Sequence, residues 1–299
     1  MLRPCIAMCV GHMANTHTGD SHSDKVSKQR DVALVAEMIH TASLVHDDIV
    51  DHAETRRGKK SINTQWDTRK STMAGDFVMA VGSRILAQVE NPDVVVILRS
   101  VQYIVNVDIQ LILYLSQVMA DLVQGEFMQL QNKDDESERF EHYLSKCFNK
   151  TASLMAYSCR ANAVLAGVDN HLVEEAFQYG RDVGVAFQLV DDLLDFTVSA
   201  DQLGKPAAAD LKLGLATAPV LFAAEKFPEL NVMIGRRFSE EGDVEKAFQL
   251  VGDSGGLQQT RNLAMRRCEK AVNSLEDFVG SPYKLALIDL CDKIINRIK

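Results

Sequence analysis

Two copies of one acidic pattern are the residues of this chain with the clearest chemical potential. Residues 47–51 read DDIVD and residues 191–195 read DDLLD, and each copy lies in apolar sequence. In a helix, aspartates at positions i and i+4 lie about 40° apart around the axis, with the middle aspartate beside them. Each motif is therefore predicted to present three carboxylates in one narrow sector. The six predicted metal ligands are Asp47, Asp48, Asp51, Asp191, Asp192 and Asp195.

Such crowding of carboxylates has a cost that a bound cation can offset. Like charges at i, i+4 disfavour a helix by roughly 0.2–0.5 kcal/mol per pair. Magnesium prefers oxygen ligands and typically takes one or two carboxylates, several waters and the oxygens of a phosphate or diphosphate. A single motif is better explained as an acidic surface, either solvated or paired with lysines. Two copies, each followed by basic residues, favour a magnesium–diphosphate site held between two helices.

The basic residues after each motif have the types that bind phosphate. Arg56 and Arg57 follow the first motif in a turn-like stretch, and Lys205 and Lys212 follow the second. Planar guanidinium groups suit the oxygens of a phosphate group. The alternative is that these are ordinary surface charges, as most arginines are.

Composition narrows the class of protein. The chain has 299 residues, 46% of them hydrophobic, with a net charge of −9. A negative charge argues against nucleic acid as a general partner, and no basic run suggests membrane attachment. Six cysteines without C-x-x-C spacing indicate neither a zinc site nor a disulfide framework, which is typical of a reducing compartment.

Helical periodicity prevails along the chain, so we predict an all-α fold and a single domain over residues 1–299. The segment 94–119 is apolar but contains Arg99, Asn106 and Asp108, so we interpret it as a buried helix pair and not as a membrane span. The predicted helices cover 31–51, 70–89 with an interruption at Gly75-Asp76, 121–131, 138–165, 172–196, 216–226, 243–253 and 257 to the terminus.

Together, these motifs resemble the trans-prenyltransferase family. The resemblance covers nearly the whole chain and is strongest to the catalytic subunits of animal decaprenyl and solanesyl diphosphate synthases. It implies an isoprenoid synthase fold, with antiparallel helices around a central cavity. The matching segments are 39–48 (IHTASLVHDD), 56–58 (RRG), 125–130 (GEFMQL), 150–151 (KT), 187–192 (FQLVDD), 204–206 (GKP) and 210–219 (DLKLGLATAP).

The resemblance also implies an activity and roles for individual residues. A member of this family ionises an allylic diphosphate of the farnesyl or geranylgeranyl type, with three Mg²⁺ ions when substrate is bound, and adds isopentenyl diphosphate units. The residues implied as catalytic are Asp47, Asp48, Lys150 and Lys205. The allylic diphosphate would contact Arg56, Lys150, Thr151, Gln188, Lys205 and Lys212. Isopentenyl diphosphate would contact Arg3, His40 and Arg57.

The N-terminus departs from the family pattern. The family's glycine-lysine-x-x-arginine-proline is represented only by Leu2-Arg3-Pro4, so the lysine of that site is missing. Either the sequence is a truncated product or its affinity for isopentenyl diphosphate is reduced. By resemblance we expect a mitochondrial enzyme of ubiquinone side-chain synthesis, although residues 1–13 do not resemble a transit peptide. We also expect a dimer, or a heteromer with a second synthase subunit.

Product length can be predicted from small side chains near the first motif. Ala42 and Ser43 lie about one helical turn before Asp47, where bulky residues would block a growing chain. Their small size predicts a long product, and the alternative is that they only permit close helix packing.

Four other functions compete with a long-chain synthase. A phosphohydrolase could use His40, His46-Asp47 and His52 as metal ligands, but it would leave the second acidic motif unexplained. A terpene cyclase usually has a different second metal motif. A short-chain, geranylgeranyl-type synthase and a noncatalytic partner subunit are the remaining alternatives.

Overall fold

The computed structural model describes the chain except for residues 1, 57, 95–137, 198–207 and 298–299. Arg57, Lys205, the predicted helix 121–131 and all of the apolar segment 94–119 except its first residue lie outside the described residues. The chain divides into two compact units, each described by itself. Unit 1 is Met1–Ala120, Leu154–Gly180 and Ser274–Leu287, and unit 2 is Asp121–Ser153, Arg181–Asn273 and Ile288–Lys299.

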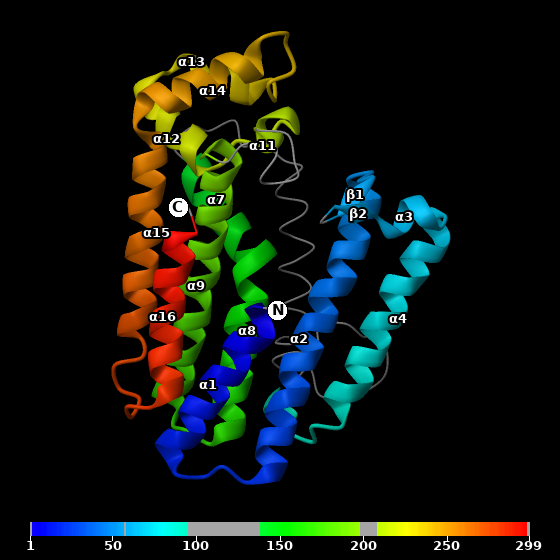
Figure 1. The fold of residues 1–299 in the computed structure, drawn as a ribbon, viewed down its shortest axis with the longest axis vertical. Coiled ribbons are helices and arrows are strands. Elements are labelled where there is room, and N and C mark those ends of the chain that lie inside the picture. Colours follow the sequence, from blue (N-terminus) through cyan, green and yellow to red (C-terminus); the bar gives the residue numbers. More distant parts are fainter. Residues whose placement is uncertain (1, 57, 95–137, 198–207, 298–299) are drawn as a thin grey trace. The chain divides into compact units, whose positions relative to one another are not determined.

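Helices make up nearly all of the regular structure in the described ranges, as the periodicity predicts (Figure 1). One small hairpin interrupts them, in which β1 (Thr55–Arg56) pairs antiparallel with β2 (Lys59–Lys60). The helices before the gap at 95–137 are α1 (Leu2–Thr18), α2 (Ser23–Val50), α3 (Ile62–Gln65) and α4 (Thr68–Ala87). Those after it are α7 (Arg139–Cys147), the π-helix η1 (Phe148–Ala152), α8 (Ser153–Ala166), α9 (Asn170–Thr197), α11 (Ala209–Lys212), α12 (Ala218–Lys226), α13 (Glu229–Gly235), α14 (Asp243–Ser254), α15 (Gly256–Asn273) and α16 (Pro282–Asn296).

Several predicted boundaries differ from the observed ones. The helix of the first motif begins at Ser23, eight residues before the predicted start at Asp31. The predicted interruption at Gly75-Asp76 is wrong, because α4 continues through both residues. The predicted helix from 257 to the terminus is divided into α15 and α16, and α1 was not predicted at all. Tertiary packing, which local periodicity does not contain, accounts for these differences.

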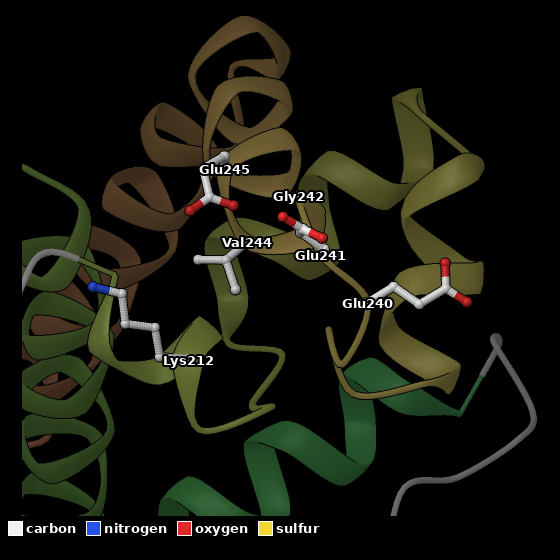
Figure 2. A pocket seen from close by; sticks show the side chains of 6 residues that line it. All are labelled: Lys212, Glu240, Glu241, Gly242, Val244 and Glu245. Carbon is white, nitrogen blue, oxygen red and sulfur yellow. The ribbon is translucent and has the colours of Figure 1, made fainter.

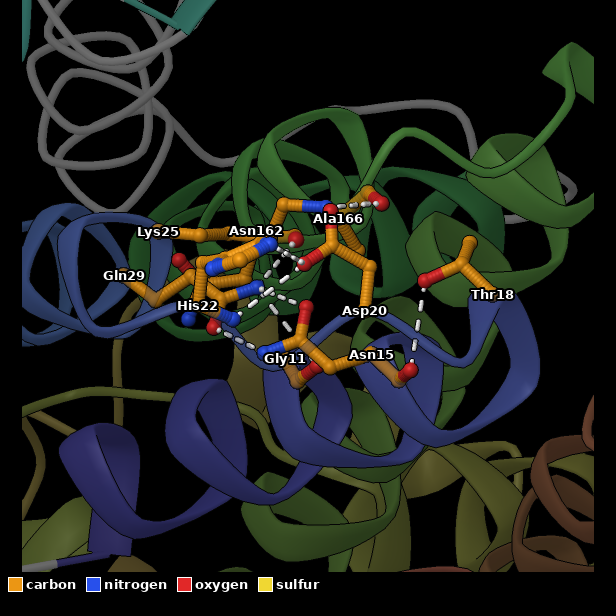
Figure 3. A network of polar contacts seen from close by, with 9 residues as sticks. All are labelled: Gly11, Asn15, Thr18, Asp20, His22, Lys25, Gln29, Asn162 and Ala166. Atoms are coloured by element: carbon orange, nitrogen blue, oxygen red, sulfur yellow. Dashed lines mark hydrogen bonds and ion pairs between the residues drawn. The ribbon is translucent and has the colours of Figure 1, made fainter.

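In unit 1, α2 packs against α1 and α4, and its buried face is mostly apolar. Two of its buried residues are polar: Asp48, in the first acidic motif, and Gln29, which is completely buried. Figure 3 shows the polar contacts of Gln29. Its amide exchanges hydrogen bonds of 2.7 and 3.0 Å with Asn15 of α1 and donates to the carbonyl oxygen of Asn162 in α8 at 3.1 Å. Asn162 in turn donates to the carbonyl oxygen of Ala7 at 2.6 Å. This network fixes the register of three helices, since each buried polar group needs its partner.

Replacing Gln29 with leucine should therefore destabilise the fold without touching the acidic motifs. The substitution leaves the Asn15 side chain and the Asn162 carbonyl without their buried partner, at an expected cost of about 2–4 kcal/mol in the free energy of unfolding. Urea denaturation of the variant measures this loss. Gln258→Leu is the matched control, because Gln258 is exposed and its amide donates to Asn262 on the surface of α15. Equal losses in the two variants would contradict the role of the network.

In unit 2, α12 is central and packs against α7, α13, α14 and α15. Its buried side chains include Val220 and Ala223, which join a cluster with Leu230, Val251 and Phe196. This apolar cluster lies next to the C-terminal end of α9, so it anchors the helix that carries the second acidic motif.

Candidate active site

The first acidic motif is at the C-terminal end of α2, in unit 1. Asp47 and Asp48 are in its last turn, and Asp51 is the C-cap residue. The backbone N–H of Asp51 donates to the carbonyl oxygen of Asp47 at 2.8 Å, so helical geometry continues to the third aspartate. Asp47 is half-buried and Asp51 is exposed, whereas Asp48 is buried. The helix therefore extends over the motif as predicted, but the three carboxylates differ in their access to solvent.

Asp48 is held by Arg56 from the β1–β2 hairpin. The Arg56 guanidinium donates to Oδ1 of Asp48 from Nε at 2.7 Å and from Nη2 at 2.5 Å. Asn63 of α3 donates from Nδ2 to the carbonyl oxygens of Asp48 and Ala53, both at 3.1 Å. The hairpin and α3 therefore fix the end of α2. Arg56 was predicted from its sequence position to bind phosphate. It lies next to the first motif, where its guanidinium contacts the carboxylate of Asp48.

Gly75 explains how α4 approaches the first motif. A Cβ atom at Gly75 would lie 2.3 Å from Nε2 of His46, the residue just before Asp47. The same ring nitrogen is 3.3 Å from the carbonyl oxygen of Thr72 and 3.5 Å from a carboxylate oxygen of Asp76. His46 is thus a contact between α2 and α4, which does not support its role as a metal ligand of a phosphohydrolase.

The second motif is within α9, and Asp192 is its most buried member. Tyr143 of α7 donates from its hydroxyl to Oδ2 of Asp192, and Gln188 donates from Nε2 to Oδ1 at 2.9 Å. Oε1 of Gln188 accepts a hydrogen bond of 2.8 Å from the Thr151 hydroxyl. Burial raises the pKa of Asp192 to about 7; the nearby Asp210 carboxylate adds to the rise, and the two hydrogen bonds oppose it. Thr151 and Gln188, predicted to contact the allylic diphosphate, therefore lie beside the second motif. Tyr143 is a further residue at this motif that the sequence did not indicate.

Asp191 is more accessible and has a basic partner that the sequence did not indicate. Arg297, just after α16, donates from Nη2 to Oδ1 of Asp191 at 2.9 Å. Its guanidinium also lies over the ring of Phe187, 4.5 Å from the centroid, in a cation–π contact. In each unit, one aspartate of the motif is therefore paired with an arginine that arrives from a later segment of the chain.

Asp195 has a different environment from the other aspartates of its motif. Its Oδ1 accepts from the backbone N–H of Ala209 at 3.2 Å, and its Oδ2 accepts from that of Asp210 at 3.1 Å. Both carboxylate oxygens thus hold the start of α11, the short helix that contains Lys212. These contacts make Asp195 an anchor for α11, and its role as a metal ligand stays a prediction.

The predicted lysines lie in distinct surroundings. Lys150 is in η1, half-buried, next to Thr151. A π-turn within a helix is rare and frequently marks a functional site. Lys212 lines an open pocket of about 530 Å³ together with Glu240, Glu241 and Glu245 (Figure 2). The structure therefore places Lys150 beside the Thr151–Gln188–Asp192 network, and Lys212 next to carboxylates of α14 and its preceding loop.

The predicted residues for isopentenyl diphosphate and product length are in unit 1. Arg3 in α1 and His40 in α2 are both half-buried. Ala42 is completely buried, and Ser43 donates from its hydroxyl to the carbonyl oxygen of His40 at 2.9 Å. An apolar pocket of about 350 Å³ beside α2 is lined instead by other residues, which include Leu34, Met38, Thr41, Met8 and Val78. The burial of Ala42 agrees with close helix packing, the alternative interpretation from sequence, and its effect on product length stays a prediction.

The donor set suits magnesium. The accessible members of the motifs are carboxylates, the hard oxygen ligands that Mg²⁺ prefers. Within the described ranges, no group of three or more His, Cys, Asp and Glu side chains is gathered closely enough to hold a metal ion by itself. The three carboxylates of one motif do not form a complete site, and diphosphate oxygens and waters would have to supply the remaining ligands. None of the helices in these ranges has the length and apolar character that crossing a membrane requires.

Comparisons with known proteins agree with this chemistry. The polyprenyl synthetase family model matches residues 1–251. The chain is 48% identical to the all trans-polyprenyl-diphosphate synthase of Homo sapiens over 99% of its own length and 67% of the relative's. It is 37% identical to the mitochondrial hexaprenyl pyrophosphate synthase of Saccharomyces cerevisiae, over 94% of this chain and 66% of the relative. The chain thus spans about two thirds of the length of both relatives.

A solved structure shows the same fold. The polyprenyl synthase of Caulobacter crescentus, determined in complex with calcium and isoprenyl diphosphate, is 31% identical, with a TM-score of 0.82. The likeness covers 100% of this chain and 85% of that one. The predicted all-α isoprenoid synthase fold is therefore confirmed. The chain belongs to the polyprenyl synthetase family, and it is a prenyltransferase of the long-chain polyprenyl diphosphate synthase type.

Proposed function

We propose that both acidic motifs serve one allylic diphosphate, whose departure they promote through bound Mg²⁺, three ions when substrate is present. Enzymes of this family are Mg²⁺-dependent and use allylic and isopentenyl diphosphates. The observation that carries the proposal is the arginine pairing in both units: Arg56 on Asp48 and Arg297 on Asp191. These ion pairs support the proposal, because in each motif one carboxylate already pairs with a positively charged side chain. When bound, Mg²⁺ neutralises the charge that develops on the leaving diphosphate.

The accessible and the buried aspartates have different roles in this proposal. Asp47, Asp51 and Asp191 present the carboxylates that can reach an ion, because they are at least partly exposed. Asp48 and Asp192 are buried and already accept hydrogen bonds from side chains of their own unit. They belong to the proposed ligand set as well, and they also stabilise the helix turns from which the accessible carboxylates project. Asp195 holds α11 and through it places Lys212.

The cationic and polar residues complete the binding of substrate. Lys150, Thr151 and Gln188 bind the allylic diphosphate together with Arg56 and Lys212, and Lys205 belongs to the same set by resemblance. Arg3, His40 and Arg57 bind the diphosphate of the isopentenyl substrate. No nucleophilic side chain is needed, since the new carbon–carbon bond forms between two substrates held at close range. The small residues Ala42 and Ser43 leave α2 without a bulky obstacle to chain growth.

The biological setting follows from the relatives. The yeast relative is described as mitochondrial, so we propose mitochondria as the site of action and the ubiquinone side chain as the destination of the product. The primer is a farnesyl or geranylgeranyl diphosphate, and the enzyme works as a dimer or with a second synthase subunit.

Incubation with radiolabelled isopentenyl diphosphate, farnesyl diphosphate and Mg²⁺ tests the proposal. A ladder of long prenols is expected after hydrolysis of the products. Excess EDTA should abolish it, because it removes the Mg²⁺ that neutralises the leaving diphosphate. Products that end at the geranylgeranyl length would indicate a short-chain synthase. A cyclic hydrocarbon or free phosphate as the main product would contradict the proposal, as would a complete lack of turnover both alone and with a second synthase subunit.

A further inference from the structure

Asp192 has an unusual environment for an ionisable residue of a metal-binding motif. Its side chain is 2% exposed. Each of its two carboxylate oxygens accepts a hydrogen bond, one from Gln188 in the same helix and one from Tyr143 in α7. Tyr143 is itself 3% exposed. Gln188 is one helical turn before Asp192, so of these two donors Tyr143 is the one that connects this carboxylate to a different helix.

The hydrogen bond from Tyr143 in α7 to Asp192 in α9 also affects the position of Asp191. Asp191 precedes Asp192 on the same turn of α9, so a change in the position of Asp192 also moves the carboxylate that faces Arg297. Groups that hydrogen-bond to a metal-site carboxylate from behind fix its orientation, and their loss typically weakens metal affinity 10–100-fold. Tyr143 is in the position of such a group, because its hydroxyl donates to Asp192 from the neighbouring helix α7.

We propose that Tyr143 is a positioning residue, whose hydroxyl holds Asp192 and thereby orients the second acidic motif for binding Mg²⁺ and diphosphate. This role rests on the proposed function of the motif. The phenol suits it because a neutral donor satisfies the buried carboxylate without competing with the metal for charge.

The phenol-to-phenyl change at Tyr143 provides a clean test. Tyr143→Phe removes one hydroxyl and keeps the ring that packs near Phe140. We expect the affinity for Mg²⁺ with inorganic pyrophosphate, measured by titration calorimetry, to fall about 10–100-fold. In steady-state assays, the Mg²⁺ concentration that gives half of the maximal rate should rise. At saturating Mg²⁺, kcat of the variant should be close to that of the original protein.

Tyr179→Phe is the matched control. Tyr179 is also completely buried, and its hydroxyl donates to the carbonyl oxygen of Leu287 at 2.9 Å, within unit 1. Both variants lose one buried hydrogen bond, so thermal denaturation should show similar decreases in stability, but only Tyr143→Phe should lose metal affinity. Unchanged Mg²⁺–pyrophosphate binding in a folded Tyr143→Phe variant would overturn the proposal, as would equal losses of binding in both variants.

The same experiment separates this role from the proposed function. If the original protein binds Mg²⁺ with pyrophosphate and makes prenyl products while Tyr143→Phe behaves like it, only the positioning role is wrong. If the original protein neither binds the metal with pyrophosphate nor makes prenyl products, the proposed function fails, and the role of Tyr143 fails with it. Should Tyr143→Phe be unstable, binding is measured below its unfolding temperature, where the circular dichroism spectrum shows a folded chain.

Discussion

Replacing Asp191 with asparagine is expected to lower kcat/KM for chain elongation by about 10²–10³-fold, the scale of losing one preorganised electrostatic contact to a leaving group. Asparagine keeps the shape of the side chain but removes the charge that attracts Mg²⁺. Asp191 is a partly exposed carboxylate of the second motif, and it already pairs with a positively charged group, Arg297, at 2.9 Å. Measurement of kcat and KM at several Mg²⁺ concentrations should show that added metal restores only part of the rate.

A second aspartate provides the control for this substitution. Asp277 is exposed and forms an ion pair of 2.9 Å with His171, so Asp277→Asn also removes one carboxylate charge from an ion pair. Surface pairs of this kind contribute little to stability, about 0–1 kcal/mol. Asp277→Asn should leave turnover unchanged. An Asp191→Asn variant with turnover within about threefold of the original protein would exclude Asp191 as an important metal ligand, since one removed transition-state contact normally costs far more.

The acidic motifs and their helices could be predicted from sequence because the signals are local. Both motifs, their apolar flanks and the following basic residues are contiguous segments, and the helices that carry them have a regular period. Arg56 was also found in this way, because only a short hairpin separates it from Asp48. Local spacing is enough when the partner of a residue is about two helical turns away in the chain.

The partners of the second motif could not be predicted for the same physical reason. Tyr143 and Arg297 are far from Asp192 and Asp191 in sequence, and their contacts depend on how helices pack in unit 2. A tyrosine in an amphipathic helix and an arginine near a C-terminus carry no distinguishing pattern. Gly75 shows the opposite error: the sequence suggested a helix interruption, but the glycine is required where His46 approaches α4.

Gly184 is a second position where a missing side chain controls the site, and Gly184→Ala should reduce both stability and activity. A Cβ atom there would lie 2.5 Å from Cα and 2.6 Å from Cβ of Ala152, the last residue of the π-helix η1. Because one of these atoms belongs to the backbone, α9 and η1 must separate. Overpacking of this kind costs about 1–3 kcal/mol. The displacement also moves Thr151 away from Gln188, and misplacement by about 1 Å can reduce the rate about 10²-fold.

Gly252→Ala is the matched control for this effect. Gly252 is also inside a helix, α14, but a Cβ atom there meets nothing within 4 Å. Alanine at that position should increase stability by about 0.5–1 kcal/mol, because glycine is a poor helix former. The two variants are compared by thermal denaturation and by turnover of radiolabelled isopentenyl diphosphate. If both variants are stabilised and active, α9 and η1 are not closely packed at Gly184, and the position of Lys150 and Thr151 does not depend on this glycine. A loss confined to Gly184→Ala instead shows that helix packing, and not only the carboxylates, sets the geometry of the second motif.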